Sequence, residues 1–454
     1  MTKKSFLAII FAAVLVFSLF SCDADNDDGE PDAPPASTDK TVVLNVYNWG
    51  EYISDGFEGA LDSNKAFEEY FNEHLASKYG HKIEVNYTTY ANNEDMYAKL
   101  KSGAGNYDIV VPSDYMIEKM IGEGMLHEFT DEQRERLSNL VYIGEDFLGT
   151  NAVYDPGNRY SVPYTYGMLG VIYNTALIDV EDYESESWEL LWNPKYRGKL
   201  LQFNNQRDAF ASAMYFHNID VNTTDEAKWR EALGYLLEQK ELVQGYVNDE
   251  IFNKMTTASA AAAPYYAGDF LIMASENEDL SFYYPAEGTN YFVDAMCIPK
   301  NARNKDLAIE YINFMLSEEP AVANALYIGY ASPNKIVLES EEYQEGMAEL
   351  HEDWYDILYG VTPAEANANY DFDPAYRSFT PETQELVNAL WESLKTENAT
   401  ELWVHLTSIT IIVAVLVLAV YSTYIKKKRS HHYRMRDREA MKANRAASVT
   451  INNA

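Results

Sequence analysis

The chain has 454 residues, of which 47% are hydrophobic and 23% charged, so it has enough apolar side chains for one or two globular cores. It carries 35 Lys and Arg against 71 Asp and Glu, a formal net charge of −36. An acidic protein of this kind repels nucleic acids and anionic substrates and concentrates cations, although the same charge is also typical of a surface kept soluble in salt or mild acid.

The N-terminus has the layout of a secretory signal. Lys3 and Lys4 precede an apolar stretch, residues 6–20, which is too short to span a bilayer comfortably. The stretch ends at Ser21-Cys22 and resembles the lipoprotein box of bacteria, whose cysteine is lipidated and becomes the mature N-terminus. A signal peptide with a chance cysteine is the alternative. We therefore expect a lipoprotein-type signal at 1–22, with Cys22 as the lipidation site.

Residues 23–40 follow the signal and differ from it in composition. They are acidic, rich in proline and nearly free of apolar side chains. Such a segment cannot bury enough apolar surface to fold, so we expect a disordered tether.

From residue 42 to about residue 394, short β-rich runs alternate with helical patterns. The β-rich runs are clearest at 42–47, 83–87 and 108–112, and a helical pattern covers 93–101. This alternation predicts an α/β architecture with a mainly parallel sheet. Because roughly 350 residues exceed one typical core, two lobes are expected. Cys297 lies in an apolar run and is predicted to be a buried small hydrophobic residue.

The C-terminal region predicts a transmembrane helix. Residues 402–425 contain no Asp, Glu, Lys or Arg, and aromatic residues stand at both ends. Four basic residues follow at 426–429, and the tail 426–454 holds nine basic and two acidic residues. By the positive-inside preference this tail is cytoplasmic, so the acidic bulk of the chain lies outside the cell membrane.

No motif of a known reaction stands out. The sequence lacks G-x-x-x-x-G-K-[ST], G-x-S-x-G and H-E-x-x-H, and only two of its eight histidines are adjacent, in the basic tail. With two cysteines in the chain, a disulfide framework and a cysteine-ligated metal site are not expected either. What remains are aromatic residues next to acids at the ends of predicted elements, where binding sites of open α/β folds gather. We expect no enzyme, no metal and no cofactor.

Seven short stretches, in order along the exported region, resemble the periplasmic spermidine/putrescine-binding proteins of ABC importers. They are YNWGEYI at 47–53, MYAKLK at 96–101, YDIVVPSDY at 107–115, SVPYTYG at 161–167, WELLW at 188–192 with YRG at 196–198, FVD at 292–294, and IGYASPN at 328–334.

The resemblance implies a hinged, two-lobe periplasmic-binding-protein fold of type II, with the ligand held between the lobes. Lobe one would comprise 41–165 and 292–335, and lobe two 166–291 and 336–396, with the hinge near Thr165 and Phe292. The implied partners are a polyamine ligand and the permease and ATPase subunits of an importer. The binding domain would be periplasmic or on the cell surface.

The resemblance also implies the binding residues, wherever this sequence matches the family. Trp49, Glu51, Tyr52, Ser113, Tyr115, Asp294 and Tyr330 match, and Phe292 and Tyr266 stand where the family has aromatic residues. The paired acids of the family are here Asn205 and Asp208, so one acid is lost. Asp269 stands where putrescine-preferring members have an acid and spermidine-preferring members typically have serine. These departures leave the preferred polyamine open. The candidate site is Trp49, Glu51, Tyr52, Ser113, Tyr115, Asp208, Tyr266, Asp269, Phe292, Asp294 and Tyr330.

These residue types suit a flexible chain of methylenes with ammonium groups at intervals, because carboxylates accept hydrogen bonds from ammonium and aromatic faces attract cations and pack on methylenes. Each type also has a purely structural explanation. Trp49 and Tyr52 would serve as core aromatics, Asp294 as a helix cap or a lysine partner, and Ser113 as a helix cap. Glu51, Asp208 and Asp269 would simply be solvated.

Two other functions fit parts of the sequence. Related two-lobe proteins bind sugars, iron or anions, although an anion site would need Arg or Lys at these positions. A single-pass polyamine sensor would use the same extracytoplasmic domain, but its 29-residue tail is too short to fold as a signalling domain and would have to recruit a partner.

Overall fold

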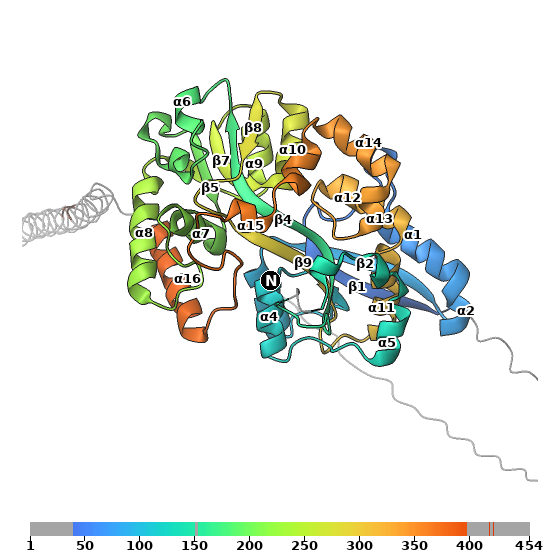
Figure 1. Ribbon diagram of the computed structural model, residues 1–454. Coiled ribbons are helices and arrows are strands. Elements are labelled where there is room, and N and C mark those ends of the chain that lie inside the picture. The colour runs from blue at the N-terminus through green and yellow to red at the C-terminus, as the bar shows by residue number, and fades with distance from the viewer. Residues whose placement is uncertain (1–39, 150–152, 397–416, 418–420, 422–454) are drawn as a thin grey trace, which may run out of the picture.

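The computed structural model describes residues 40–149 and 153–396, together with Val417 and Tyr421, and shows an α/β protein of two lobes (Figure 1). The predicted signal, the tether up to residue 39, the basic tail and all but two residues of the predicted transmembrane segment lie outside the described residues. Within the described residues, no helix combines the length and the apolar character that a membrane span requires.

Nine strands form the sheet in the order β2-β1-β3-β9-β4-β7-β5-β6, with β8 paired to β4. The pairs β1–β2, β1–β3, β5–β6 and β5–β7 are parallel, whereas β4 and β9 run antiparallel to their neighbours. The expected mainly parallel sheet is therefore found only toward the two ends, because two central strands run back across the molecule. The strands are β1 Thr41–Trp49, β2 Lys82–Tyr90, β3 Ile109–Val110, β4 Ser161–Asn174, β5 Leu200–Phe203, β6 Val243–Val247, β7 Ala262–Tyr266, β8 Leu280–Tyr283 and β9 Tyr291–Cys297.

Helices cover the sheet, and the helical pattern expected at 93–101 is confirmed as α3. Within the described residues the α-helices are α1 Ser63–Tyr70, α2 Ala76–Tyr79, α3 Asn93–Lys101, α4 Asp114–Gly122, α5 Asp131–Arg136, α6 Val180–Tyr183, α7 Gln206–Phe216, α8 Glu226–Lys240, α9 Glu250–Thr256, α10 Ala267–Glu276, α11 Lys305–Met315, α12 Glu318–Ile328, α13 Lys335–Glu339, α14 Glu341–Leu350, α15 Pro363–Ala366 and α16 Pro381–Thr396.

The long strand β4 joins the two lobes. Its first part, Ser161–Met168, pairs with β9, and its second part, Leu169–Asn174, pairs with β7 and β8. The register against β9 shifts between Pro163 and Thr165, so Tyr164 is an extra residue in the strand. Such a bulge bends a strand and re-aims the neighbouring side chains. Strand β4 is therefore deformed shortly before it passes from one lobe to the other.

Successive side chains of a strand point to opposite faces of the sheet, so one strand contributes to the apolar core on each side. Strand β1 contributes Leu44 and Val46 to one apolar cluster and Tyr47 to another, as expected for a strand covered on both faces. The second lobe packs around Trp188 and the helix α7, most of whose residues are buried. Cys297 on β9 is a free, fully buried cysteine, which confirms its prediction as a small hydrophobic residue.

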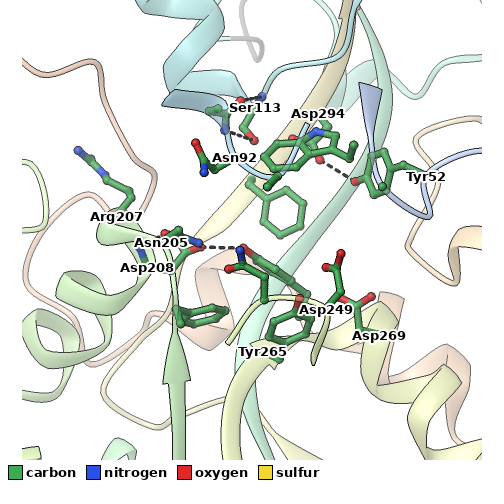
Figure 2. A pocket seen from close by; sticks show the side chains of 18 of the residues that line it. Tyr52, Asn92, Ser113, Asn205, Arg207, Asp208, Asp249, Tyr265, Asp269 and Asp294 are labelled. Carbon is green, nitrogen blue, oxygen red and sulfur yellow. Dashed lines mark hydrogen bonds between the residues drawn. The ribbon is translucent and has the colours of Figure 1, made fainter. Parts of the chain in front are cut away.

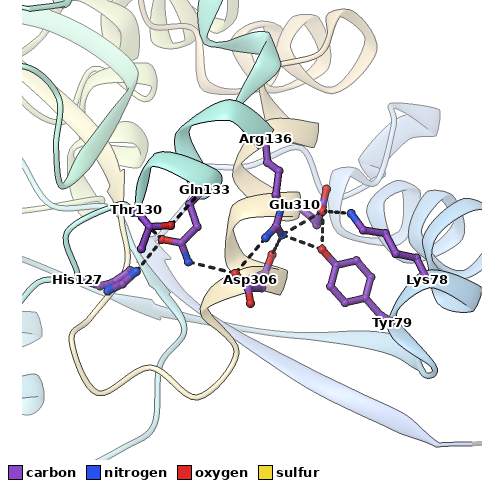
Figure 3. Close-up of polar contacts among 8 residues, drawn as sticks. All are labelled: Lys78, Tyr79, His127, Thr130, Gln133, Arg136, Asp306 and Glu310. Atoms are coloured by element: carbon purple, nitrogen blue, oxygen red, sulfur yellow. Dashed lines mark hydrogen bonds and ion pairs between the residues drawn. The ribbon is translucent and has the colours of Figure 1, made fainter.

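A polar network fastens three helices of the first lobe together (Figure 3). Arg136 on α5 donates to Asp306 Oδ1 at 3.0 Å, to Glu310 Oε1 at 3.1 Å and to the Tyr79 hydroxyl at 2.7 Å. Tyr79 on α2 in turn donates to Glu310 on α11 at 2.6 Å. One arginine therefore links α2, α5 and α11 on the side of the lobe away from the sheet centre.

We expect Arg136→Met to lower the unfolding free energy by about 1–3 kcal/mol, because the largely buried carboxylate of Glu310 would lose its cation; the exposed carboxylate of Asp306 would be affected less. Arg230→Met is the matched control, since Arg230 pairs with Glu226 on the exposed surface of α8. Exposed pairs contribute little, so the control should change stability by about 0.5 kcal/mol or less. Chemical denaturation of both variants measures the difference. Equal effects would contradict the structural role assigned to the network.

Candidate functional site

A cavity of about 140 Å³ lies between the two lobes (Figure 2). A buried water needs about 10–15 Å³ measured in this way, so the cavity has room for roughly ten waters or a small extended solute. Its walls come from residues that follow β1, β3, β5, β6 and β7, together with β9, the start of α3 and the end of α12. The ends of strands at a change in strand order are the usual position of ligand sites in open α/β sheets.

All eleven residues expected from the sequence line this one cavity, although they span 282 positions of the chain from Trp49 to Tyr330. Three of the structural alternatives can be assessed. Asp294 caps no helix, because it lies within β9, and no ion pair with a lysine forms at it among the described residues. Ser113 is at the N-cap position of α4, but its hydroxyl makes no capping bond and instead accepts from Asn93 Nδ2 at 3.0 Å. Tyr52 belongs to both the core and the cavity wall.

Asp294 is the most buried acid of the cavity, with 4% of its surface exposed. The Tyr52 hydroxyl donates to its Oδ2 at 2.6 Å, and its Oδ1 is buried without a hydrogen-bond partner among the described residues. Burial raises the pKa of Asp294 to about 6, and the charge of Asp208 adds to the rise, while the Ser113 and Tyr52 hydroxyls oppose it. An unpartnered buried carboxylate oxygen is unfavourable by itself and requires a donor.

Asp208 lies at a second end of the cavity, at the start of α7. Its carboxylate accepts from Tyr266 at 2.7 Å, from Tyr376 at 2.8 Å and from the N-cap residue Asn205 at 2.6 Å. Asn205, which stands where the family has the first of its paired acids, therefore donates a hydrogen bond to the remaining acid, Asp208. Glu94, at the start of α3, lies nearby and accepts from the Tyr115 hydroxyl at 3.1 Å, and burial raises its pKa.

Three further carboxylates gather at a third end of the cavity. Asp269, in the first turn of α10, accepts from the Tyr330 hydroxyl at 2.6 Å. Burial raises the pKa of Asp269 to about 7, and the charge of Asp249 adds to the rise. Glu51 is exposed and accepts from Tyr327 at 2.7 Å, whereas the carboxylate of Asp249 accepts no hydrogen bond within the described residues. This end of the cavity therefore concentrates negative charge.

Tyrosine hydroxyls hold the carboxylates of the cavity. Five of its six acids accept a hydrogen bond from a tyrosine: Glu51, Glu94, Asp208, Asp269 and Asp294. A neutral hydroxyl orients a carboxylate and leaves its charge in place, whereas an arginine or lysine would neutralise it. The acids are thus fixed in place and remain available to a cation.

Aromatic rings form the walls between the acids. The rings of Phe292 and Tyr266 lie 5.5 Å apart between their centroids, and the Trp49 indole is fixed by a 2.8 Å bond from its Nε1 to the Val111 carbonyl. Gly268 allows Tyr330 to approach, because a Cβ at that position would lie 2.0 Å from Tyr330 Cδ1. These faces provide apolar contact and attract cations.

Arg207 is the basic residue of the cavity lining. Its guanidinium lies over Phe379, Tyr376 and Tyr115 at 3.7, 4.4 and 5.5 Å from the ring centroids. Figure 2 shows its side chain turned away from the central aromatic residues. Arg207 therefore supports the wall of the cavity from behind, by joining α7 to α4 and to the segment before α16.

Sequence reasoning missed several lining residues, including Glu94, Arg207, Asp249 and Tyr376. Glu94 lies in the first turn of the predicted helix 93–101, shortly after a β-rich run, a position at which it could have been suspected. Asp249 and Tyr376 lie in loops, and nothing in their local sequence points to the cavity.

The lining contains no histidine and no cysteine, and the described residues include no group of three or more His, Cys, Asp or Glu side chains arranged to hold a metal ion. What the arrangement provides is a set of fixed negative charges separated by aromatic faces. Its chemistry is that of binding a small, elongated cation.

Comparisons with known proteins agree with the two-lobe α/β fold. Residues 65–349 match the family model of bacterial extracellular solute-binding proteins. Spermidine/putrescine-binding periplasmic protein 1 of Haemophilus influenzae is 31% identical, over 73% of this chain and 86% of that protein. The spermidine/putrescine-binding periplasmic protein of Escherichia coli is 32% identical, over 66% and 80%. The solved spermidine/putrescine ABC transporter substrate-binding protein of Streptococcus pneumoniae has a TM-score of 0.58 at 30% identity, covering 78% and 98%.

The raised pKa of Asp269 predicts how pH affects the stability of the ligand-free protein. Its pKa is about 7 in the folded protein, against an ordinary value of 3.8 for aspartate. Protonation of Asp269 therefore contributes stability that is fully present below about pH 4 and is lost as the pH rises through about 7. Asp269→Asn should raise the unfolding free energy by about 1–3 kcal/mol at pH 8 and change it little at pH 5.

Thermal unfolding at the two pH values, without ligand, measures this difference. Asp279→Asn serves as the control, because Asp279 is an exposed acid of the same lobe. A destabilising effect of Asp269→Asn at pH 8 would show that the carboxylate is needed for folding rather than for binding.

Proposed function

Because the chain belongs to the family of bacterial extracellular solute-binding proteins, we propose that it captures polyamines outside the cytoplasm and delivers them to an ABC importer. The observation that carries the polyamine assignment is the set of six carboxylates in one cavity, five of them held by tyrosine hydroxyls and all lying among aromatic rings. The prediction of a binding protein rather than an enzyme agrees with the relatives, which are named as binding proteins.

A polyamine matches this cavity in charge and shape. Each ammonium group donating to a carboxylate contributes on the order of 1.5–3 kcal/mol, and each cation over an aromatic face about 0.5–2 kcal/mol. Carboxylates stand at three ends of the cavity, around Asp294, Asp208 and Asp269, so a chain with two or more ammonium groups can reach more than one of them. The methylenes between the ammonium groups would pack on Phe292, Trp49 and the other rings.

We assign the eleven predicted residues to this site and add two acids that line the same cavity. Glu94 would serve the ammonium group near Asp208, and Asp249 the one near Asp269. Asp294 has the largest role, because a hydrogen bond from the ligand would satisfy its buried, unpaired Oδ1 and remove the cost of leaving that acceptor without a donor.

Capture would proceed by closure of the two lobes, 41–165 with 292–335 and 166–291 with 336–396, about the hinge near Thr165 and Phe292. The change of partners along β4 after Met168 supports this placement, since a strand that changes sheets is a natural connection between two rigid bodies. A ligand that bridges carboxylates from both lobes would favour the closed form.

The protein would be held at the membrane twice, by a lipid on Cys22 and by a spanning helix at 402–425 with the tail 426–454 in the cytoplasm. The support is the sequence itself, namely the signal layout, the uncharged apolar stretch and the basic residues that follow it. Permanent anchoring would keep the binding domain near the permease and ATPase subunits, where its effective concentration is high.

Calorimetry of the full-length chain with putrescine, spermidine and spermine tests the ligand assignment, and Asp294→Asn tests the site. The substitution keeps the shape and one acceptor but leaves the ligand cation without its buried partner. Removing one side of such a pair costs about 2–5 kcal/mol, or roughly 30-fold or more in affinity. The melting temperature of the ligand-free protein should not fall.

The control for this experiment is again Asp279→Asn, which removes one exposed negative charge outside the cavity. It should bind within about twofold of the parent, since a distant exposed charge is largely screened. Absence of any heat at millimolar polyamine would reject the function. Binding by Asp294→Asn equal to the parent would remove this residue from the site.

Protease treatment of intact cells tests the proposed topology. Digestion should remove the acidic domain and spare a tag fused after Ala454, and Cys22→Ala should leave the protein in the membrane fraction. A spanning helix inserts in an effectively irreversible way, whereas a single lipid anchor binds more weakly. Loss of the tag, or release of Cys22→Ala into the soluble fraction, would reject the spanning helix.

A further inference from the structure

Three polar side chains lie in a row across the centre of the sheet. Asp294 on β9 pairs with Thr165 on β4 and forms a bridge to Ser113, which follows β3 on the other side. Directly opposed residues of antiparallel strands place their side chains on the same face of the sheet. The Asp294 carboxylate therefore lies between two residues that carry hydroxyl groups.

The Tyr52 hydroxyl connects Asp294 to Thr165. It donates to Asp294 Oδ2 at 2.6 Å and lies 2.6 Å from Thr165 Oγ1. A phenol has one proton, and an ionised carboxylate can only accept. Because the proton of Tyr52 is used on Asp294, Thr165 is the donor in the second bond. The hydrogen bonds thus run in one direction, from Thr165 through Tyr52 to the ionised Asp294.

The bulge in β4 explains how this strand holds both ends of Tyr52. Successive side chains of a regular strand point to opposite faces, but the register shift around Tyr164 re-aims them. The Tyr164 hydroxyl donates to the backbone carbonyl of Tyr52 at 3.0 Å, while Thr165 bonds to its phenol group. Tyr52 is therefore fixed at its backbone and at its tip by two consecutive residues.

Thr165 itself does not line the ligand cavity. Its side chain is 3% exposed and faces a smaller cavity of about 20 Å³ behind Tyr330. Thr165 therefore does not contact a ligand in this cavity directly, and its hydrogen bond to Tyr52 connects it to Asp294.

We infer that Thr165 is a positioning residue for the binding site, whose hydroxyl, acting through Tyr52, keeps the Asp294 carboxylate ionised and oriented toward the ligand. The inference rests on the proposed function for the identity of the ligand, but the hydrogen bonds exist without one. Removing the Thr165 hydroxyl would leave Tyr52 a poorer donor, since hydrogen bonds in a chain strengthen one another.

The surroundings of Asp294 disfavour its charged form, which makes the hydroxyl donors important. Besides the hydroxyls of Ser113 and Tyr52, which favour the charged form, it is faced by the carboxylate of Asp208 from α7, by that of Asp114 from α4 and by Tyr90 from the end of β2. None of these groups brings a positive charge to Asp294. Its negative charge therefore depends on neutral hydrogen-bond donors.

Thermal unfolding of the ligand-free, full-length chain tests the inference by comparing Thr165→Val, Thr165→Ser and the parent at pH 5 and pH 8. Valine keeps the shape and removes the donor, whereas serine keeps the donor. Thr165→Val should melt roughly 2–4 °C lower than the parent at pH 8, where Asp294 is ionised, and within about 1 °C at pH 5. Thr165→Ser should show no such dependence on pH. In an Asp294→Asn background, the pH-dependent part of the effect should vanish.

Polyamine affinity provides the second measurement. At pH 7.5, Thr165→Val should bind about five- to tenfold more weakly, and Thr165→Ser within about twofold of the parent. Thr383→Val is the control for loss of a buried threonine hydroxyl, because Thr383 lies on α16, outside the cavity lining. It should leave the affinity unchanged.

The outcomes separate this inference from the proposed function. If the parent binds no polyamine, the proposed function fails, and the unfolding comparison still decides the role of Thr165. A loss of stability in Thr165→Val that is equal at both pH values, or that persists in the Asp294→Asn background, would overturn the inference and leave Thr165 a purely structural residue. Unchanged polyamine affinity of Thr165→Val would overturn it as well.

Discussion

The structure around the cavity depends on one constraint, which is to hold several carboxylates in a partly buried space without a cation that would neutralise them. Desolvation of a charged group is unfavourable, and a lysine or arginine partner would remove the charge that a cationic solute needs. The chain meets this constraint with tyrosine. The hydroxyls that orient Glu51, Asp269 and Asp294 belong to Tyr327, Tyr330 and Tyr52 and come from different parts of the fold.

The topology of the sheet provides the positions that this constraint requires. Strands β9 and β4 run antiparallel through the centre and bring Asp294 beside Thr165, while the ends of β5 and β7 bring Asp208 and Tyr266 to the opposite wall. Backbone pairing within the sheet thus fixes Asp294 more rigidly than a loop would. The acids at the cavity ends, such as Asp249, lie on loops and first turns of helices and have fewer fixed contacts.

Much of the candidate site was predictable, because short matching stretches carry residues that follow strands. Trp49 ends β1, Tyr52 follows it, and Asp294 lies in β9, and the stretches that carry them resemble the family closely enough to name them. The partners of these residues were not predictable. Tyr52 and Thr165 are 113 positions apart, and their contact depends on a bulge that leaves no signal in the sequence. The antiparallel centre of the sheet was missed for a similar reason. A β-rich run indicates that a strand is present, but it does not indicate whether the strand pairs in a parallel or an antiparallel direction.

The unpartnered oxygen of Asp294 affects the stability of the ligand-free protein and, through it, its expected turnover. A carboxylate that is buried and unsatisfied lowers the stability of the empty form, so the requirements of function oppose those of folding at this position. Occupancy of the cavity reverses the effect, because any solute that binds only the folded state stabilises it by mass action. Proteases outside the cytoplasm act on transiently opened chains in proportion to their population. We therefore expect the empty form to be degraded more readily, so that the abundance of the protein would follow the supply of its ligand.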